Sequence, residues 1–380
     1  MDGKIPNRAS FILRVAGLTA LFIIILNLVF GLTAAEKWLG KGSLYSHVYP
    51  GRWRFPWSEN PSAAYNVSTN NLDALYAAHE VSATPIPEDE FRVFFLGDSS
   101  TWGFYLPKEK TVSAYVNAAE AETPDGRPIR AYNLGYPTIS LTKDLLLLSE
   151  SLKYEPDLIV WVTTLEAFPV EKQIFTPLVE QNRTEVRALI ETYDISIETT
   201  AEEFPIETFL DRSIFGRRRA LANLFRLQLY GVLWSATGID QDIPDNYTPL
   251  QSDYEIDDSY YSFSPPQLDR SRLMIDVLQA GIEMAGETPV LIVNEPIYIS
   301  RGENSDIRYN FFYPRWAYDD YRAWMKETAN LEGWYYADFW NEIPSENFTN
   351  TAIHFNAEGS QNLANLILLE IQDILENLQP

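Results

Sequence analysis

Five short apolar runs, each ending in turn residues, recur from residue 91 onward. They are FRVFFLG (91–97), IRAYNLG (129–135), PDLIVWVTT (156–164), TPVLIVNEP (288–296) and GWYYADFW (333–340). Their apolar residues are mostly consecutive and do not alternate with polar ones, which indicates strands buried on both faces. Because amphipathic stretches of helical period separate most of the runs, the pattern predicts an α/β fold in which a parallel sheet lies between helices.

The N-terminal part of the chain follows a different pattern. Residues 15–35 are 21 positions without a charge, preceded by three basic residues. At a rise of about 1.5 Å per residue, this run is long enough to cross a hydrocarbon core of about 30 Å. We therefore expect a single transmembrane anchor, with residues 1–14 in the cytoplasm and the rest of the chain outside. A cleaved signal peptide is the alternative, although the run exceeds the usual apolar length of such peptides.

Two further regions complete the expected organisation. Residues 36–90 are rich in aromatic residues, proline and asparagine, and we expect them to form a strap that links the anchor to a globular domain at 91–380, with a short helix near 72–79. The third and fourth runs are separated by about 120 residues, which is too many for a simple crossover. We therefore expect an insertion at about 170–285.

Two segments have the apolar pattern of helices. GRRRALANLFRLQLYGVLW (216–234) is basic at its start and apolar nearly all round afterwards. Such a helix can lie on a membrane surface, cover a site as a lid or pack inside the protein, and the pattern favours internal packing. In the last helix, a core-facing stripe at helical spacing is formed by Leu363, Ile367, Ile371, Ile374 and Leu378.

Charge and composition exclude several functional classes. The net charge of −24 argues against a nucleic acid or an anionic membrane as a partner bound through bulk charge. The chain has no cysteine, so disulfides, thiolate nucleophiles and zinc–thiolate sites are excluded. Nothing in the sequence implies a metal or another cofactor, and we expect none.

Candidate catalytic residues follow the predicted strands, because ligands of open parallel sheets bind beyond the carboxyl ends of the strands. Ser99 comes directly after the first run in GDSST, where a nucleophile and a helix cap are both reasonable. A serine nucleophile needs a base. His47 in the strap and His79 before the first run are expected to be ordinary surface or packing residues. His354 lies between the last strand and the last helix, where a base can face Ser99.

These motifs resemble the GDSL or SGNH hydrolase family. The resemblance rests on GDSST after the first strand, NLG after the second, and a loop histidine followed by Asn-Ala-Glu-Gly, and it covers roughly residues 90–170 and 288–380. It implies a flavodoxin-like three-layer α/β/α sandwich and a serine that attacks an ester carbonyl. By position, Ser99 is the nucleophile, His354 is the general base, and the backbone N–H groups of Ser99 and Gly135 contribute to the oxyanion hole.

Two positions depart from the family pattern. Glu166 occupies the place of an asparagine that completes the oxyanion hole, and an ionised carboxylate there would repel an oxyanion unless it is protonated or another donor takes over. Thr351 occupies the place of the triad aspartate, and neither it nor the preceding Asn350 supplies a carboxylate. A Ser-His dyad, or a carboxylate from Asp338 or the insertion, is the expected solution.

The sequence therefore predicts a membrane-anchored, extracytoplasmic serine esterase or O-acyltransferase that acts on acyl esters, in particular those of cell-envelope carbohydrate. Its expected partners are an acylated carbohydrate or small ester and, by analogy with relatives that carry an N-terminal span, a membrane-bound O-acyltransferase. The alternative is a non-catalytic SGNH-like binding or scaffold protein in envelope polysaccharide assembly. A peptidase is less consistent, because nothing suggests a peptide-binding edge.

Two other segments are candidates for the pocket. Asn294 and Glu295 follow the fourth strand and either line a pocket or form a turn. Residues 308–322 are dense in arginine and tyrosine, which suits stacking on sugar rings or pairing with carboxylates, but equally suits a packed helix start.

Overall fold

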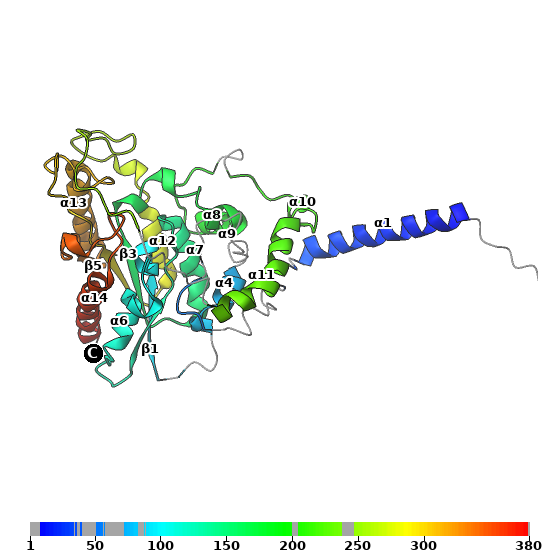
Figure 1. The fold of residues 1–380 in the computed structure, drawn as a ribbon, viewed down its shortest axis with the longest axis horizontal. Helices are drawn as coiled ribbons and strands as arrows, with labels where there is room; N and C mark the ends of the chain where they lie inside the picture. The colour runs from blue at the N-terminus through cyan, green and yellow to red at the C-terminus, as the bar shows by residue number, and fades with distance from the viewer. Residues whose placement is uncertain are drawn as a thin grey trace, which may run out of the picture.

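Five parallel strands form the centre of the fold, in the order β2-β1-β3-β4-β5 (Figure 1). This is the strand order of flavodoxin-like sheets, so the predicted fold class is confirmed. Each of the five apolar runs contains one strand: β1 (Phe91–Leu96), β2 (Ile129–Asn133), β3 (Leu158–Thr163), β4 (Val290–Asn294) and β5 (Tyr335–Asp338).

The computed structural model describes residues 8–33, 51–55, 72–82, 89–199, 204–237 and 247–378, together with the single positions 35, 39, 57 and 87. His47 lies outside the described residues. The helices of the described part are α1 (Arg8–Thr33), α4 (Leu72–Ala77), α5 (Ser99–Trp102), α6 (Val112–Ala118), α7 (Leu141–Ser151), α8 (Pro177–Gln181), α9 (Arg183–Thr192), α10 (Phe209–Arg212), α11 (Arg218–Thr237), α12 (Ile275–Ala285), α13 (Arg315–Glu332) and α14 (Ala357–Asn377).

Helices cover both faces of the sheet, which makes the three layers that the sequence predicts. α6 and α14 pack on one face, and α4, α7, α12 and α13 pack on the other. Successive strand residues point to opposite faces, so Phe95 of β1 joins the core under α14 while Phe94 joins the core under α7. Both faces therefore need apolar side chains, and this explains the continuous apolar runs.

The connection between β3 and β4 contains α8 to α12. Its last helix, α12, packs beside α7 against the sheet, so this part of the expected insertion belongs to the sheet's own crossover. At the C-terminus, the predicted stripe on α14 is buried at Leu363, Ile367, Ile371 and Ile374. Leu378 is exposed instead, because the helix ends at Asn377.

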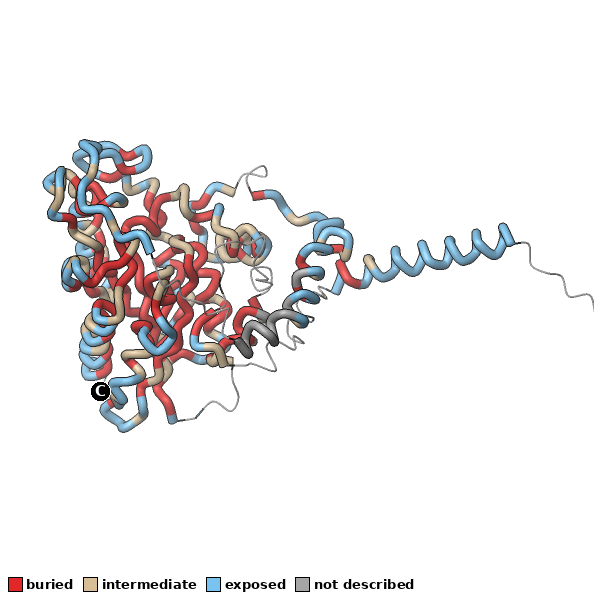
Figure 2. Tube along the Cα trace, in the orientation of Figure 1, coloured by how far each residue is buried: buried red, intermediate tan, exposed pale blue. Residues whose placement is uncertain are grey.

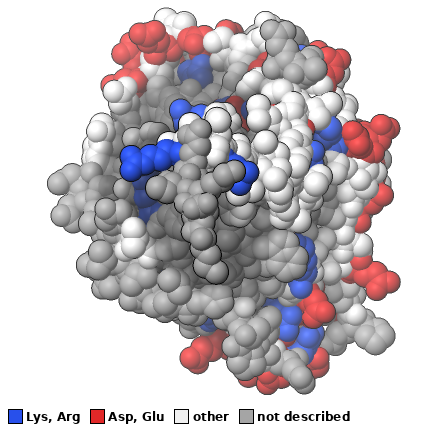
Figure 3. All heavy atoms as spheres, turned by 90° about the vertical axis from the view of Figure 1, so that its right-hand side faces the viewer, with Lys and Arg blue, Asp and Glu red and all other residues white. Residues whose placement is uncertain are grey.

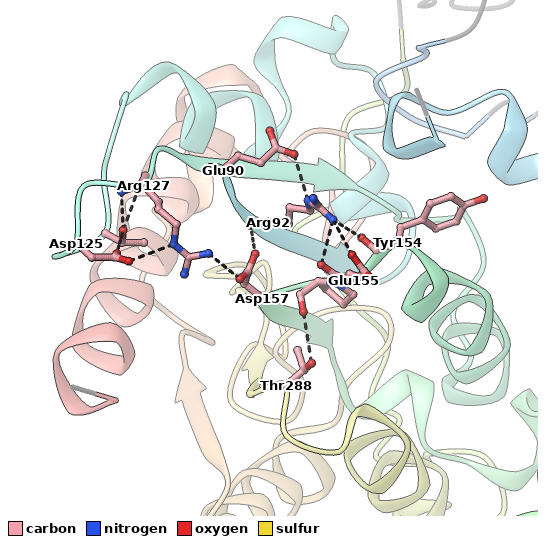
Figure 4. Close-up of polar contacts among 10 residues, drawn as sticks. Glu90, Arg92, Asp125, Arg127, Tyr154, Glu155, Asp157 and Thr288 are labelled. Atoms are coloured by element: carbon pink, nitrogen blue, oxygen red, sulfur yellow. Dashed lines mark hydrogen bonds and ion pairs between the residues drawn. The ribbon is translucent and has the colours of Figure 1, made fainter. Parts of the chain in front are cut away.

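The amino ends of β1 and β3 are joined by a network of charged residues (Figure 4). The Arg92 backbone N–H donates to Asp157 Oδ2 at 2.8 Å, and Arg127 Nη1 donates to Asp157 Oδ1 at 3.0 Å. Arg92 Nη1 also donates to the Tyr154 carbonyl at 3.0 Å. This network joins the strands at their amino ends. The candidate site lies at the opposite edge of the sheet, beyond the carboxyl ends of the strands.

The described parts of the strap pack against the turn after β1. Arg54 is 2% exposed, its Nη1 donates to the carbonyls of Gly103 and Leu106 at 2.9 and 3.0 Å, and its guanidinium lies 4.0 Å from the centre of the Trp102 ring. Trp102 Nε1 in turn donates to the Phe55 carbonyl at 2.7 Å. The strap therefore holds the C-terminal end of α5, the short helix that begins with Ser99.

His79 is a packing residue, as the sequence predicts. It is fully buried, its Nδ1 accepts from the Val81 N–H at 3.1 Å, and its Nε2 faces the Asn133 carbonyl at 2.9 Å. The expected short helix in this part of the strap is α4.

α1 projects away from the domain and is exposed along almost all of its length (Figure 2). Among the described residues it is the one helix that is long and apolar enough to cross a membrane, with 26 residues. A signal sequence would share these properties, so the anchor, its retention and its orientation stay predictions.

We predict that Arg54→Met lowers the free energy of unfolding by about 1.5–3 kcal/mol, because the carbonyls after α5 lose a charged donor and stay buried. Chemical or thermal unfolding of the full chain in detergent measures the change. Lys110→Met, at an exposed position in the same region, is the control and should change stability by less than about 0.5 kcal/mol. Equal effects of the two substitutions would contradict the proposed role of Arg54.

Candidate active site

The turn after β1 places Ser99 at the start of α5. Gly97 has φ +152°, and a Cβ at this position would lie 2.9 Å from the Val162 carbonyl oxygen, so the turn requires glycine. Asp98 is the helix N-cap, and its Oδ1 accepts from the Ser100 N–H at 2.8 Å. The helix-cap interpretation of GDSST is therefore correct for Asp98, whereas Ser99 is the first residue of the helix and its hydroxyl is directed elsewhere.

The Ser99 hydroxyl meets the imidazole of His354 across 255 residues of sequence. The distance from Ser99 Oγ to His354 Nε2 is 2.6 Å. His354 lies in a loop between β5 and α14 that is closed at its base by two backbone bonds, from Thr349 N–H to the His354 carbonyl at 2.9 Å and from Asn356 N–H to the Asn347 carbonyl at 2.8 Å. These two bonds brace the loop from which the His354 imidazole reaches Ser99.

Thr351, which the sequence places at the position of the triad aspartate, does not contact His354 by a hydrogen bond among the described residues; Asn350 lies instead where an aspartate lies in a Ser-His-Asp triad. Its Oδ1 lies 2.8 Å from His354 Nδ1. Because an amide oxygen only accepts, Nδ1 carries the proton, and Nε2 is free to accept from the Ser99 hydroxyl. Asn350 therefore selects the tautomer needed for a general base, although it lacks the charge that would stabilise an imidazolium.

Burial keeps His354 neutral. Its imidazole is stacked on the Phe104 ring, with centroids 4.9 Å apart, and the residue is 7% exposed. Burial lowers the pKa of His354 to about 4. The imidazole is therefore a free base at neutral pH, as an acceptor of the serine proton must be.

Glu166 is directed toward tyrosines and a lysine. Its Oε1 forms an ion pair with Lys172 Nζ at 2.7 Å and accepts from the Tyr261 hydroxyl, and its Oε2 accepts from the Tyr260 hydroxyl at 3.3 Å. Among the described residues, no hydrogen bond joins its side chain to Ser99 or His354. The carboxyl group that the sequence places in the oxyanion hole thus pairs with a lysine and accepts hydrogen bonds from two hydroxyls.

The Gly135 N–H, which the sequence predicts as an oxyanion donor, already donates to Asn133 Oδ1 at 3.1 Å. Glycine is needed here for close packing, because a Cβ would lie 2.6 Å from the Trp102 nitrogen of α5. Ser99 differs, since as the first residue of α5 its N–H has no acceptor within the helix.

Asp338 is not the partner of His354. Its Oδ2 pairs with Arg322 Nη2 at 2.7 Å, and its Oδ1 accepts from Asn294 Nδ2 at 2.8 Å. The segment 308–322 is largely structural as well, because Arg308 is buried and donates to five backbone carbonyls around it. The packed interpretation is therefore correct for most of this segment.

A cluster of buried charged residues supports the Ser99 turn from inside the protein. Ser100 Oγ donates to Glu295 Oε2, and Lys143 Nζ donates to the Gly97 carbonyl at 2.7 Å and pairs with Asp144. Glu295 is fully buried and is not among the lining residues of the described cleft. Burial, with the neighbouring charge of Asp98, raises the pKa of Glu295 well above its usual range, which favours its protonated form.

A cleft of about 420 Å³ opens next to Asn350, the hydrogen-bond partner of His354, and neither Ser99 nor His354 is among its lining residues. Asn350 forms part of its wall, and Tyr105 in the wall has its ring centre 6.5 Å from that of His354. The lining residues are Tyr105, Thr248, Pro249, Leu250, Gln251, Tyr254, Phe311 and Asn350. The cleft thus combines aromatic surfaces with amide and hydroxyl groups. Among the described residues, no group of three or more His, Cys, Asp or Glu side chains could hold a metal ion.

From the sequence, Asn350 is a poor triad member because it lacks a charge, and Phe104, Tyr105 and the 248–254 segment are not among the residues predicted for the site. One signal was available: Asn350 precedes His354 by four residues in one loop. The aromatic pair after GDSSTWG was a second. The 248–254 segment carries no local signal, because it joins the site only through the fold.

No family model matches the sequence, and no curated protein matches it. Solved structures match at low similarity. A member of the lipolytic protein G-D-S-L family from Veillonella parvula DSM 2008 is 12% identical, with 73% of this chain and 96% of that chain covered and a TM-score of 0.34. A carbohydrate acetylesterase family member from Sinorhizobium meliloti is 12% identical, with 75% and 99% covered and a TM-score of 0.33. Because these similarities are low, we infer function from the geometry of the site alone.

We predict that His354 titrates near pH 4 and that Asn350→Asp raises its pKa, because a carboxylate stabilises the imidazolium that an amide cannot. NMR titration of the histidine ring signals measures this, and the chain has only three histidines to assign. Asn377→Asp at the exposed end of α14 is the matched control and should leave the titration unchanged. A pKa near 6.5 in the parent protein would contradict the burial of His354.

Proposed function

We propose that the protein is a serine esterase or O-acyltransferase that forms an acyl-enzyme on Ser99. The observation that carries the proposal is the hydrogen-bonded line from Ser99 Oγ to His354 Nε2 at 2.6 Å and from His354 Nδ1 to Asn350 Oδ1 at 2.8 Å. Nucleophile, base and orienting group thus lie in the order and at the distances that acyl transfer requires.

The chemistry follows from this line. Ser99 Oγ attacks the acyl carbonyl carbon while His354 Nε2 takes the hydroxyl proton. When the tetrahedral intermediate collapses, the bond to the leaving alcohol breaks and His354 returns the proton to that alcohol. Water or a sugar hydroxyl then attacks the acyl-Ser99 carbonyl while His354 takes its proton. The bond from the acyl carbon to Ser99 Oγ breaks, and His354 returns the proton to Ser99, which gives hydrolysis or transfer.

The site has few hydrogen-bond donors for the oxyanion that forms on the substrate. The Ser99 N–H at the start of α5 is one donor, and the Gly135 N–H can contribute only if it exchanges Asn133 Oδ1 for the substrate oxygen. Each missing donor of this kind costs about 10²–10³ in rate. Together with an uncharged Asn350, this indicates an enzyme that turns over slowly.

The cleft supports a carbohydrate ester as substrate. Tyr105, Tyr254 and Phe311 offer ring faces, and Gln251 and Asn350 offer amide groups, a combination that suits the apolar faces and hydroxyls of a sugar. The predicted anchor α1 would hold the site outside the cytoplasm, where acylated envelope glycans and a membrane-bound O-acyltransferase are accessible.

We predict that a fluorophosphonate probe labels the full chain at Ser99, and that Ser99→Ala abolishes labelling. Asn350→Ala should slow labelling measurably, because His354 loses the group that selects its tautomer, but by less than the about 10⁴-fold cost of a wrong tautomer. Thr351→Ala is the matched control and should label at the parent rate, since Thr351 makes no hydrogen bond to His354 among the described residues. Absence of labelling in a folded parent protein would overturn the enzyme proposal and favour the scaffold.

A second prediction concerns the cleft. Tyr254→Ala should raise KM for an acetylated sugar by about three- to tenfold, the worth of one aromatic stacking contact, with kcat unchanged. KM for ethyl acetate, which has no ring to stack, should not change. Phe175→Ala, an exposed aromatic residue outside the cleft lining, is the control. Equal changes for both esters would show that the cleft does not bind the sugar.

A further inference from the structure

Residues 206–219, which we call the interface segment, expose apolar side chains that the fold does not use. The segment comprises α10, its flanking turns and the start of α11. Ile206, Leu210 and Phe215 are 69%, 60% and 63% exposed. Farther along α11, Phe225 and Leu229 are also exposed, so internal packing, the preferred interpretation of 216–234 from sequence, is wrong for these side chains. Exposed apolar side chains grouped in one segment indicate a surface that binds something.

The interface segment is held against the C-terminal part of α1. Phe209 packs on Gly31, where a Cβ would come within 2.8 Å of its ring, and the Phe215 N–H donates to Asn27 Oδ1 at 3.3 Å. Asn27 and Gly31 lie within the uncharged run 15–35, eight and four residues before its end. At about 1.5 Å per residue, these contacts lie about 12 and 6 Å inside the end of the run.

This depth has a direct consequence. If the run spans the hydrocarbon core, the interface segment lies at the boundary between the acyl chains and the headgroups, where interfacial helices sit about 5–10 Å deep. The contacts with α1 thus place the exposed Leu210 and Phe215 where lipid, and not water, surrounds them.

The charge of the segment is opposite to that of the chain. It contains four arginines and two acidic residues, whereas the chain as a whole carries −24. Arg212, Arg218 and Arg219 are exposed, and Arg217 pairs with Glu207. Figure 3 looks onto the side from which α1 projects, and the acidic side chains of the described residues lie mostly toward the rim of this view. Exposed arginines next to exposed apolar residues are the composition of segments that bind anionic lipid.

We propose that the interface segment binds the surface of an anionic lipid bilayer at the outer end of α1. Leu210 and Phe215 enter the acyl boundary, and Arg212, Arg218 and Arg219 extend to the lipid phosphates. The inference rests on α1 as a membrane span, which is part of the proposed function. With a helix through the membrane and a second contact on it, the domain is held in one orientation above the bilayer. The local charge thus overrides the bulk charge, which argued against an anionic membrane.

The absence of cysteine makes the test direct, because one introduced cysteine gives one label. The full chain carries Leu210→Cys, labelled with an environment-sensitive fluorophore, and is reconstituted into vesicles of phosphatidylcholine with or without phosphatidylglycerol. Brominated lipids then quench a label that lies in the bilayer. Phe22→Cys in α1 is the reference for a membrane position, and Leu369→Cys, 63% exposed on α14, is the matched control on the domain.

We expect blue-shifted, quenched emission at positions 22 and 210, and unquenched emission at 369. Quenching at 210 should be stronger in vesicles with phosphatidylglycerol, and replacing Arg212, Arg218 and Arg219 by glutamine should remove that difference while quenching at 22 persists. Quenching at 22 without quenching at 210 would overturn the inference alone. A blue shift at 210 without quenching would mean that a protein covers the segment, and would also overturn it. No quenching at 22 would overturn the membrane anchor and the inference together.

Discussion

The hydrogen bond between Ser99 and His354 is the contact on which the proposed catalytic chemistry depends. It joins the first strand's turn to the last loop of the chain, and both must be rigid for it to form. One side is rigid because Gly97 and Asp98 fix the turn, and the other because backbone bonds close the loop around His354. The parallel sheet brings the two together, since the carboxyl ends of β1 and β5 lie at the same edge.

A cluster of buried charged side chains lies beneath the Ser99 turn. Lys143 is completely buried, and it is surrounded by the carboxyl groups of Asp98, Asp144 and Glu295. Burial raises the pKa of Asp144 to about 6. Buried charged groups are costly and weak as sources of stability. Their contacts with the Gly97 carbonyl and the Ser100 hydroxyl indicate that the cluster instead holds the Ser99 turn in place.

Two segments connect α1 with the rest of the structure. Arg54 and Phe55 of the strap contact Trp102 of α5, so the segment that follows α1 in the chain packs against the helix that begins with Ser99. The interface segment returns from the β3–β4 connection to contact α1. The two segments that depart most from a simple sheet framework are therefore those that link the domain to α1.

The sequence alone determined the elements whose cause is local. Continuous apolar runs specify strands buried on both faces, 21 uncharged residues specify a helix of membrane length, and GDSST specifies a strand, a cap and a helix start. His354 was also identifiable, because it is the one histidine of three that lies after a predicted strand, in the loop before the last helix.

Only the tertiary structure decided which group each site side chain faces. Whether Asn350 or Thr351 reaches His354 is set by how the loop closes, and whether Glu166 faces the oxyanion or Lys172 is set by where Lys172, Tyr260 and Tyr261 pack. The contact of the interface segment with α1 joins residues 188 positions apart in the chain. The sequence gives the type of each side chain. The group that a side chain contacts depends on packing between residues far apart in the chain, and no local sequence pattern specifies that contact.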